Sequence, residues 1–86
     1  MEKIYQVGED GPLQIDGHDD AIAGTAVIWR DHKRVEVLVY SGHKIVETLM
    51  ERDGMSDEEA VEYVEYNIEG AYVGDHTPVV FWHDDM

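Results

Sequence analysis

Three of the segments in which histidine adjoins aspartate are candidates for chemistry, because these side chains commonly bind metal ions or transfer protons. They are His18-Asp19-Asp20, Asp75-His76 and His83-Asp84-Asp85. None has the i, i+4 spacing that would place two ligands on one face of a helix, and none matches a recognised metal-site pattern. The sequence therefore predicts neither a metal site nor a cofactor. Surface histidines among loop acids explain these residues more simply.

Other reactive side chains are also scarce. The two serines, Ser41 and Ser56, each precede a helical segment and are better interpreted as helix caps than as nucleophiles. The absence of cysteine excludes disulfides, iron–sulfur clusters and thiolate zinc sites. The glycine pairs at 8/11 and 70/74 lack the following lysine and the βαβ context of a phosphate-binding loop. No carboxylate pair stands out for acid–base chemistry, so the pattern favours a protein without enzymatic activity and assigns no catalytic residue.

One group of like side chains is dense enough to define a surface. Residues 53–69 contain seven acids and no base. On a helical wheel at about 100° per residue, four glutamates fall within about 60° of one another, and two tyrosines flank them away from the apolar stripe. These residues are Glu58, Glu62, Glu65, Glu69, Tyr63 and Tyr66.

Stability alone does not favour such a row, because like charges one turn apart destabilise an isolated helix by a few tenths of a kcal/mol per pair. Tyrosine is enriched at interfaces, and a row of carboxylates attracts a basic partner. We therefore predict that this face binds a partner protein. The alternative is a solvated acidic face whose tyrosine rings fold onto the edge of the core.

The charge of the whole chain supports the same class of partner. Twenty acids and six Lys or Arg residues give a net charge of −14, and residues 44–86 alone carry twelve acids and two bases. Direct nucleic-acid binding requires a basic patch, so it is not expected. A partner with a basic surface is favoured. Acidity of this kind also serves solubility or adaptation to high salt, and this interpretation remains open.

Two amphipathic helices must position the acidic row, at about 42–52 and 57–69. Ser41 caps the first helix, and Gly54 is placed to end it in a left-handed turn. Ser56 and Glu59 have the spacing of a capping box for the second helix, which Gly70 ends. The apolar stripes of the two helices are formed by Ile45, Val46, Leu49 and Met50, and by Ala60, Val61, Val64 and Ile68.

The remaining segments have the pattern of short strands. Residues 21–30 and 34–40 are rich in β-branched side chains and predict a hairpin, in which Gly24 marks a bulge or a close approach. Residues 4–7, 13–15 and 77–83 predict further strands, and Pro78 favours an edge position or a strand start. The fold class is therefore α+β: a small antiparallel sheet of three or four strands with the two helices packed on one face.

The length of 86 residues fits one domain over 1–86, with residues 84–86 as a loose tail. No basic start followed by an apolar run marks secretion, and no apolar stretch approaches the length of a membrane span. We therefore expect a cytoplasmic protein that does not engage a membrane.

Part of the chain resembles a family of small uncharacterised proteins of bacteriophages and prophages. The resemblance lies in residues 49–80, LMERDGMSDEEAVEYVEYNIEGAYVGDHTPVV, and in residues 19–24, DDAIAG. The shared pattern is DGM[ST]-x-EEA, aromatic-x-Asn, Gly-Ala-aromatic-Val-Gly and Thr-Pro, and here it falls on 53–60, 66–67, 70–74 and 77–78. The resemblance covers about half of the chain and carries no catalytic assignment. It implies a phage-type origin, the cytoplasm of a host cell, and a fold of this size. The first strand and the acidic tail depart from the pattern.

These observations lead to one functional hypothesis and two alternatives. The hypothesis is a non-enzymatic protein that binds a host or phage protein through the Glu/Tyr face of the second helix. In its sharper form the face mimics nucleic acid or inhibits a host defence protein. The first alternative is a small enzyme or ligand- or metal-binding domain that uses the His/Asp loops. The second is a structural or homo-oligomeric phage component whose acidity serves solubility.

Overall fold

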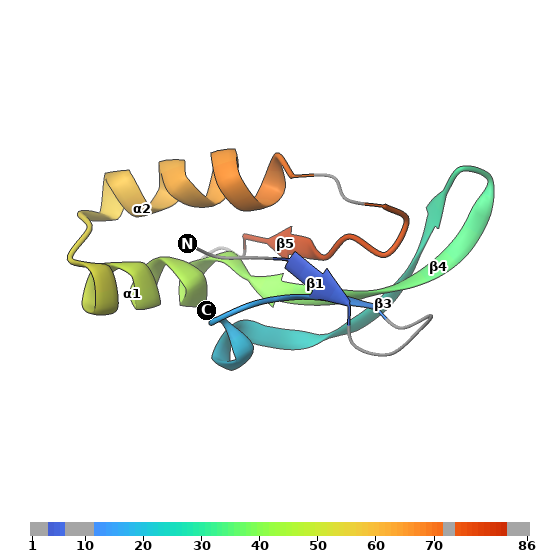
Figure 1. Cartoon of the computed structure of the whole chain (residues 1–86), viewed down its shortest axis with the longest axis horizontal. Helices are drawn as coiled ribbons and strands as arrows, with labels where there is room; N and C mark the ends of the chain where they lie inside the picture. Colours follow the sequence, from blue (N-terminus) through green and yellow to red (C-terminus); the bar gives the residue numbers. More distant parts are fainter. Residues whose placement is uncertain (1–3, 7–11, 72–73, 83–86) are drawn as a thin grey trace.

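The computed structural model describes residues 4–6, 12–71 and 74–82 (Figure 1). For 4–6 it describes the backbone alone. In chain order the elements are β1 (Ile4–Gln6), β2 (Leu13–Ile15), the short 3-10 helix η1 (Asp19–Ala21), β3 (Ile22–Arg30), β4 (Lys33–Ser41), α1 (Gly42–Asp53), α2 (Asp57–Val64), the π-helical segment η2 (Glu65–Glu69) and β5 (Val79–Phe81). The predicted α+β class is confirmed.

The strands form a two-stranded sheet, β1-β2, and a three-stranded sheet in the order β3-β4-β5. In the larger sheet β3 and β4 are antiparallel, whereas β5 is parallel to β4. The prediction of a wholly antiparallel sheet is therefore wrong for β5. Its direction follows from the chain path: α1 leads away from the end of β4, α2 returns, and the following segment turns once more before β5 (Figure 1). After the helical pair and this last turn, β5 runs in the same direction as β4 and pairs with its last three residues.

The β3–β4 hairpin closes through Asp31 and His32, which both have positive φ angles, 51° and 66°. Two consecutive residues of this kind form the type I′ turn that matches the twist of a two-stranded ribbon. Gly24 lies at a shift in the β3–β4 register, as predicted for a bulge.

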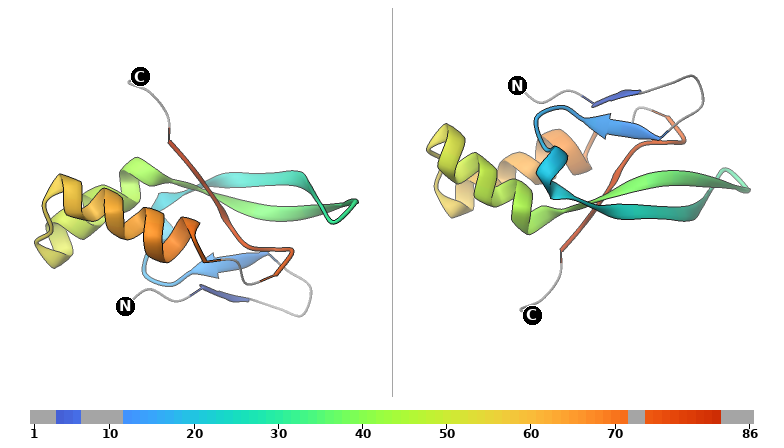
Figure 2. Two further views of the ribbon diagram at one scale, coloured as in Figure 1. Left: turned by 90° about the horizontal axis from the view of Figure 1, so that it is seen from above. Right: turned by 90° about the horizontal axis from the view of Figure 1, so that it is seen from below.

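Because β5 pairs only with the last three residues of β4, residues 25–38 extend beyond the three-stranded part of the sheet (Figures 1 and 2). We call residues 25–38 the arm.

The core lies between the helices and the end of β4 that joins α1. Tyr40 is fully buried there, and its hydroxyl oxygen accepts a hydrogen bond from the backbone N–H of Ile15 in β2, at 2.8 Å. The helices contribute their apolar stripes, except that Met50 is 39% exposed and the prediction is wrong for this residue. The buried residues form one cluster: Ile15, Ala21, Tyr40, Ile45, Val46, Leu49, Ala60, Val64 and Ile68. The two helices gather at one end of the hairpin, and the arm lies at the other end (Figure 2).

The predicted caps are confirmed, and the helices predicted at about 42–52 and 57–69 correspond to α1 and to α2 continued by the π-helical η2. The Ser41 hydroxyl accepts from the N–H of Lys44 at 3.3 Å, and Gly54 ends α1 with a φ of 71°. At the start of α2 the Ser56 hydroxyl accepts from the N–H of Glu59, whose carboxylate accepts from the N–H of Ser56. This reciprocal pair is the predicted capping box.

The short strands agree with the sequence in outline. The predicted extended segments at 4–7 and 13–15 are the paired strands β1 and β2, although Val7 lies outside the described residues. The last strand covers only 79–81 of the predicted 77–83, and it is an edge strand preceded by Pro78. His83 and the predicted tail, 84–86, lie outside the described residues.

Replacing the cap at the start of α2 tests how this helix is anchored. Ser56→Ala removes the oxygen that satisfies a first-turn N–H, so we expect a loss of about 1 kcal/mol in the free energy of unfolding. Denaturant unfolding measures it, with Ser56→Thr as the control that keeps a hydroxyl. Equal stability of the alanine variant and the native chain would show that water replaces the cap at no cost.

Candidate functional site

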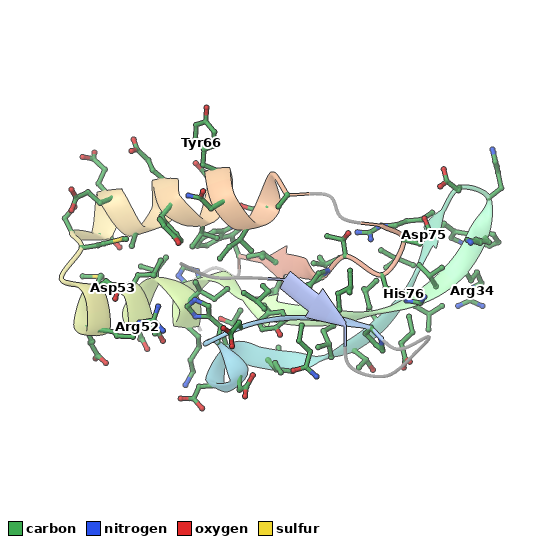
Figure 3. The ribbon with its side chains drawn as sticks, viewed as in Figure 1. Arg34, Arg52, Asp53, Tyr66, Asp75 and His76 are labelled. Atoms are coloured by element: carbon green, nitrogen blue, oxygen red, sulfur yellow. The ribbon has the colours of Figure 1, made fainter. Side chains whose placement is uncertain are left out.

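The candidate site is the outer side of α2 and η2. Ala60, Val64 and Ile68 are buried against the rest of the core, so the helix has only one orientation that covers its apolar stripe. The polar residues between them must then face outward, and Figure 3 shows this side of α2 at the surface of the molecule. The site is therefore positioned by burial of the opposite side of the same helix.

The glutamates of the predicted row are all exposed, as are Asp57 and Glu59 in the first turn. Among the residues that the structure describes, no lysine or arginine forms an ion pair with Glu58, Glu62 or Glu65. Carboxylates one turn apart lie about 5–6 Å from each other at their Cβ atoms, and no lysine or arginine in the described part of the chain offsets the repulsion of these three. The face thus presents a concentrated negative potential to solvent.

Tyr63 and Tyr66 differ in their environment. Tyr66 is 86% exposed, and its side chain points away from the body of the protein (Figure 3). Tyr63, in contrast, is partly buried and packs against the core cluster. The prediction that both rings lie away from the apolar stripe is therefore wrong for Tyr63, because its ring covers the edge of the core. Tyr66 is the aromatic residue that is available to a partner.

Glu69 is at the surface but is engaged within the chain. Its carboxylate oxygen Oε1 accepts a hydrogen bond from the indole N–H of Trp82, at 3.1 Å. The last five residues of the helix form a π-turn, in which the N–H of Gly70 donates to the carbonyl of Glu65 at 3.0 Å. An i→i+5 bond winds the chain less tightly than an α-helix, so the angles of an α-helical wheel do not apply to Glu69. The sequence-based row of four equivalent carboxylates is reduced to three.

Trp82 fixes this end of the helix to the start of α1. Its ring lies directly on Gly42, where an added Cβ would come within 2.6 Å of ring atom Cε3. It also meets the His43 ring edge to face, with ring centroids 5.6 Å apart. Sequence reasoning did not assign this role to Trp82, since nothing in the local pattern relates a residue near the C-terminus to two helix ends.

An open depression lies beside Tyr66 and is lined by Glu62, Glu65, Tyr66 and Gly70. Two carboxylates and an exposed phenol surround it. Such a depression suits a cationic side chain, because a lysine or arginine can pair with the carboxylates while its alkyl stem or guanidinium plane contacts the ring.

The histidines that the structure describes do not form a second candidate site. His18 is 2% exposed, so the interpretation of this residue as a surface histidine is wrong: the turn after β2 folds it inward. His76 donates from Nδ1 to the carbonyl of Glu36 at 2.8 Å, which holds its loop against β4. Within residues 4–6, 12–71 and 74–82, no three His, Asp or Glu side chains are arranged to hold a metal ion.

No protein-family model matches the chain, and no curated protein or solved structure is significantly similar to it. In the part of the chain that the structure describes, no helix is both long enough and apolar enough to cross a membrane.

The contact between Trp82 and Gly42 gives a direct test of how the end of η2 is held. Gly42→Ala should displace the Trp82 ring and break its hydrogen bond to Glu69, because the new Cβ overlaps the ring. In a Trp29→Phe background, tryptophan fluorescence then reports Trp82 alone, and its emission should shift to longer wavelength. Thr48→Ala, on the partly exposed side of α1, is the control. Emission that is unchanged in the Gly42→Ala variant would contradict the contact.

Proposed function

We propose that the chain is a non-enzymatic binding protein that holds a basic surface of a host or phage protein against α2. The observation that carries this proposal is the exposed set of Glu58, Glu62, Glu65 and Tyr66, which no cation of the described residues neutralises. Their exposure leaves the carboxylates in contact with water, so they contribute more to attraction and orientation of a partner than to folding.

The chemistry of the face supports a protein partner rather than a small substrate. Ser41 and Ser56 are both occupied as helix caps, which removes the two serines from consideration as nucleophiles. The depression beside Tyr66 is open to solvent, whereas sites for small molecules enclose most of the ligand. A broad charged face with one exposed aromatic residue fits recognition of a lysine- or arginine-rich surface.

The sharper form of the proposal is that the face substitutes for nucleic acid on a nucleic-acid-binding protein, such as a host defence protein. Successive carboxylates along α2 are separated by about 5–6 Å, comparable to the distance between phosphates along a strand. A protein that binds phosphates through lysine and arginine would meet a similar arrangement of negative charge on α2. The resemblance to phage proteins is consistent with such a role, and a phage-type origin of the chain is part of the proposal.

Neutralising two carboxylates tests the proposal against a matched control. The double variant Glu62→Gln, Glu65→Gln should retain its fold and capture less of its partner from a bacterial lysate at low salt, because the attraction is electrostatic. The control is Glu47→Gln, Glu51→Gln, which makes the same change of charge on the exposed side of α1. Equal capture of the same protein by both variants would contradict the proposed face.

Two further measurements separate the parts of the contact. Tyr66→Ala should weaken capture most at high salt, where screening leaves the apolar contact as the main contribution. Tyr63→Ala should instead lower the free energy of unfolding, because that ring packs on the core.

If the face mimics nucleic acid, a DNA duplex should displace the captured protein, whereas retention of the protein would contradict the mimicry.

A further inference from the structure

The arm, residues 25–38, carries an apolar face that the rest of the described structure leaves exposed. Val27 is 52% exposed and Trp29 is 70% exposed, although both lie within the nine-residue strand β3. They share one face of the hairpin with their cross-strand neighbours Glu36 and Arg34. We call this the outer face of the arm.

The opposite face of the arm is covered by the chain itself. Arg30 donates from Nη1 to the carbonyls of Asp75 and Thr77, at 2.7 and 3.0 Å, and Lys33 pairs with the carboxylate of Asp75 at 2.8 Å. Val35 and Val37 on this side are buried. The arm is therefore held against residues 74–77 on one side, and its other side presents Trp29 to solvent.

The charge of the arm differs from that of the rest of the protein. It contains three bases and two acids, for a net charge of +1 in a chain of −14, so all other residues together carry −15. A second copy that approached through its helices would meet strong repulsion, whereas two arms can meet without it. The helices and the arm lie at opposite ends of the molecule (Figures 1 and 2), so contact between arms also leaves the acidic helices far apart.

We propose that the outer face of the arm is the interface with a second copy of this chain. A closed dimer requires a self-complementary surface, and the outer face has one. A two-fold axis that crosses the strands at the level of Ile28 and Val35, which are cross-strand partners, reverses the direction of the second arm. Arg34 then lies over the partner's Glu36, and Glu36 lies over the partner's Arg34.

The same axis brings the apolar residues together. Trp29 pairs across the hairpin with Arg34, and Val27 pairs with Glu36, so Trp29 lies over the partner's Val27 in each half of the interface. The two arms pack face to face, as two sheets do, with two Arg–Glu pairs beside two Trp–Val contacts. This interface is independent of the acidic face of α2, which remains available to another protein.

A charge swap tests the two-fold arrangement directly. Sedimentation equilibrium at physiological ionic strength measures the dissociation constant of the dimer. Arg34→Glu alone and Glu36→Arg alone should each weaken the dimer roughly tenfold or more, because each places like charges opposite one another. The double variant Arg34→Glu, Glu36→Arg should recover the dimer, because the two-fold axis restores both opposite-charge pairs.

Matched controls exclude an effect of net charge or folding. Lys44→Glu and Glu47→Arg make the same changes of charge on exposed positions of α1 and should leave the dissociation constant unchanged. Trp29→Ala should weaken the dimer while the circular dichroism spectrum stays native, since its side chain is exposed in the single chain. A native chain that remains monomeric up to about 1 mM would overturn the proposal, and so would a double variant as weak as the single variants.

Discussion

The buried hydrogen bond between the Tyr40 hydroxyl and the N–H of Ile15 is the interaction on which the rest of the structure depends. A buried N–H without an acceptor costs about 1–3 kcal/mol, so β2 is held where the phenol can reach it. Tyr40 is also the residue before the cap of α1, and its ring is fully buried in the cluster that both helices share. One side chain thus joins the β1–β2 sheet, the central strand β4 and the helical pair. The position of α2, and with it the acidic face, follows from that junction.

The acidic face is stable because α2 is anchored independently of its charges. The capping box satisfies two N–H groups at the start of the helix, and the acids of the first turn lie at the positive end of the helix dipole. At the other end an acid is unfavourable, yet Glu69 gains a hydrogen bond from Trp82. The repulsion along Glu58, Glu62 and Glu65 is therefore offset by contacts elsewhere. A concentrated negative surface can persist on a helix whose buried side holds it in place.

The sequence predicted those features that local chemistry controls: both helices, their caps and the β3–β4 hairpin. It failed where residues distant in the chain determine the outcome. β5 is parallel because the chain turns once more after the two helices, and Glu69 accepts a hydrogen bond from Trp82, a residue that no helical wheel includes. His18 is buried and Tyr63 covers the core edge, although both residue types are common at surfaces. The sequence also did not predict that one face of the arm is exposed. Ala26 and Ile28 alternate with Val27, so both faces of β3 are apolar and the pattern does not distinguish the exposed face from the covered one.

The central claim is that α2 presents its outer side to a basic partner, and site-specific photo-crosslinking tests it most directly. A photoreactive phenylalanine analogue placed at Tyr66 lies at the centre of the proposed contact, and the same analogue at Glu51, exposed on α1, lies outside it. In a bacterial lysate we expect position 66 to crosslink one protein through a lysine- or arginine-rich segment, and high salt to suppress the product. A product that forms equally from position 51, or that is insensitive to salt, would contradict the account.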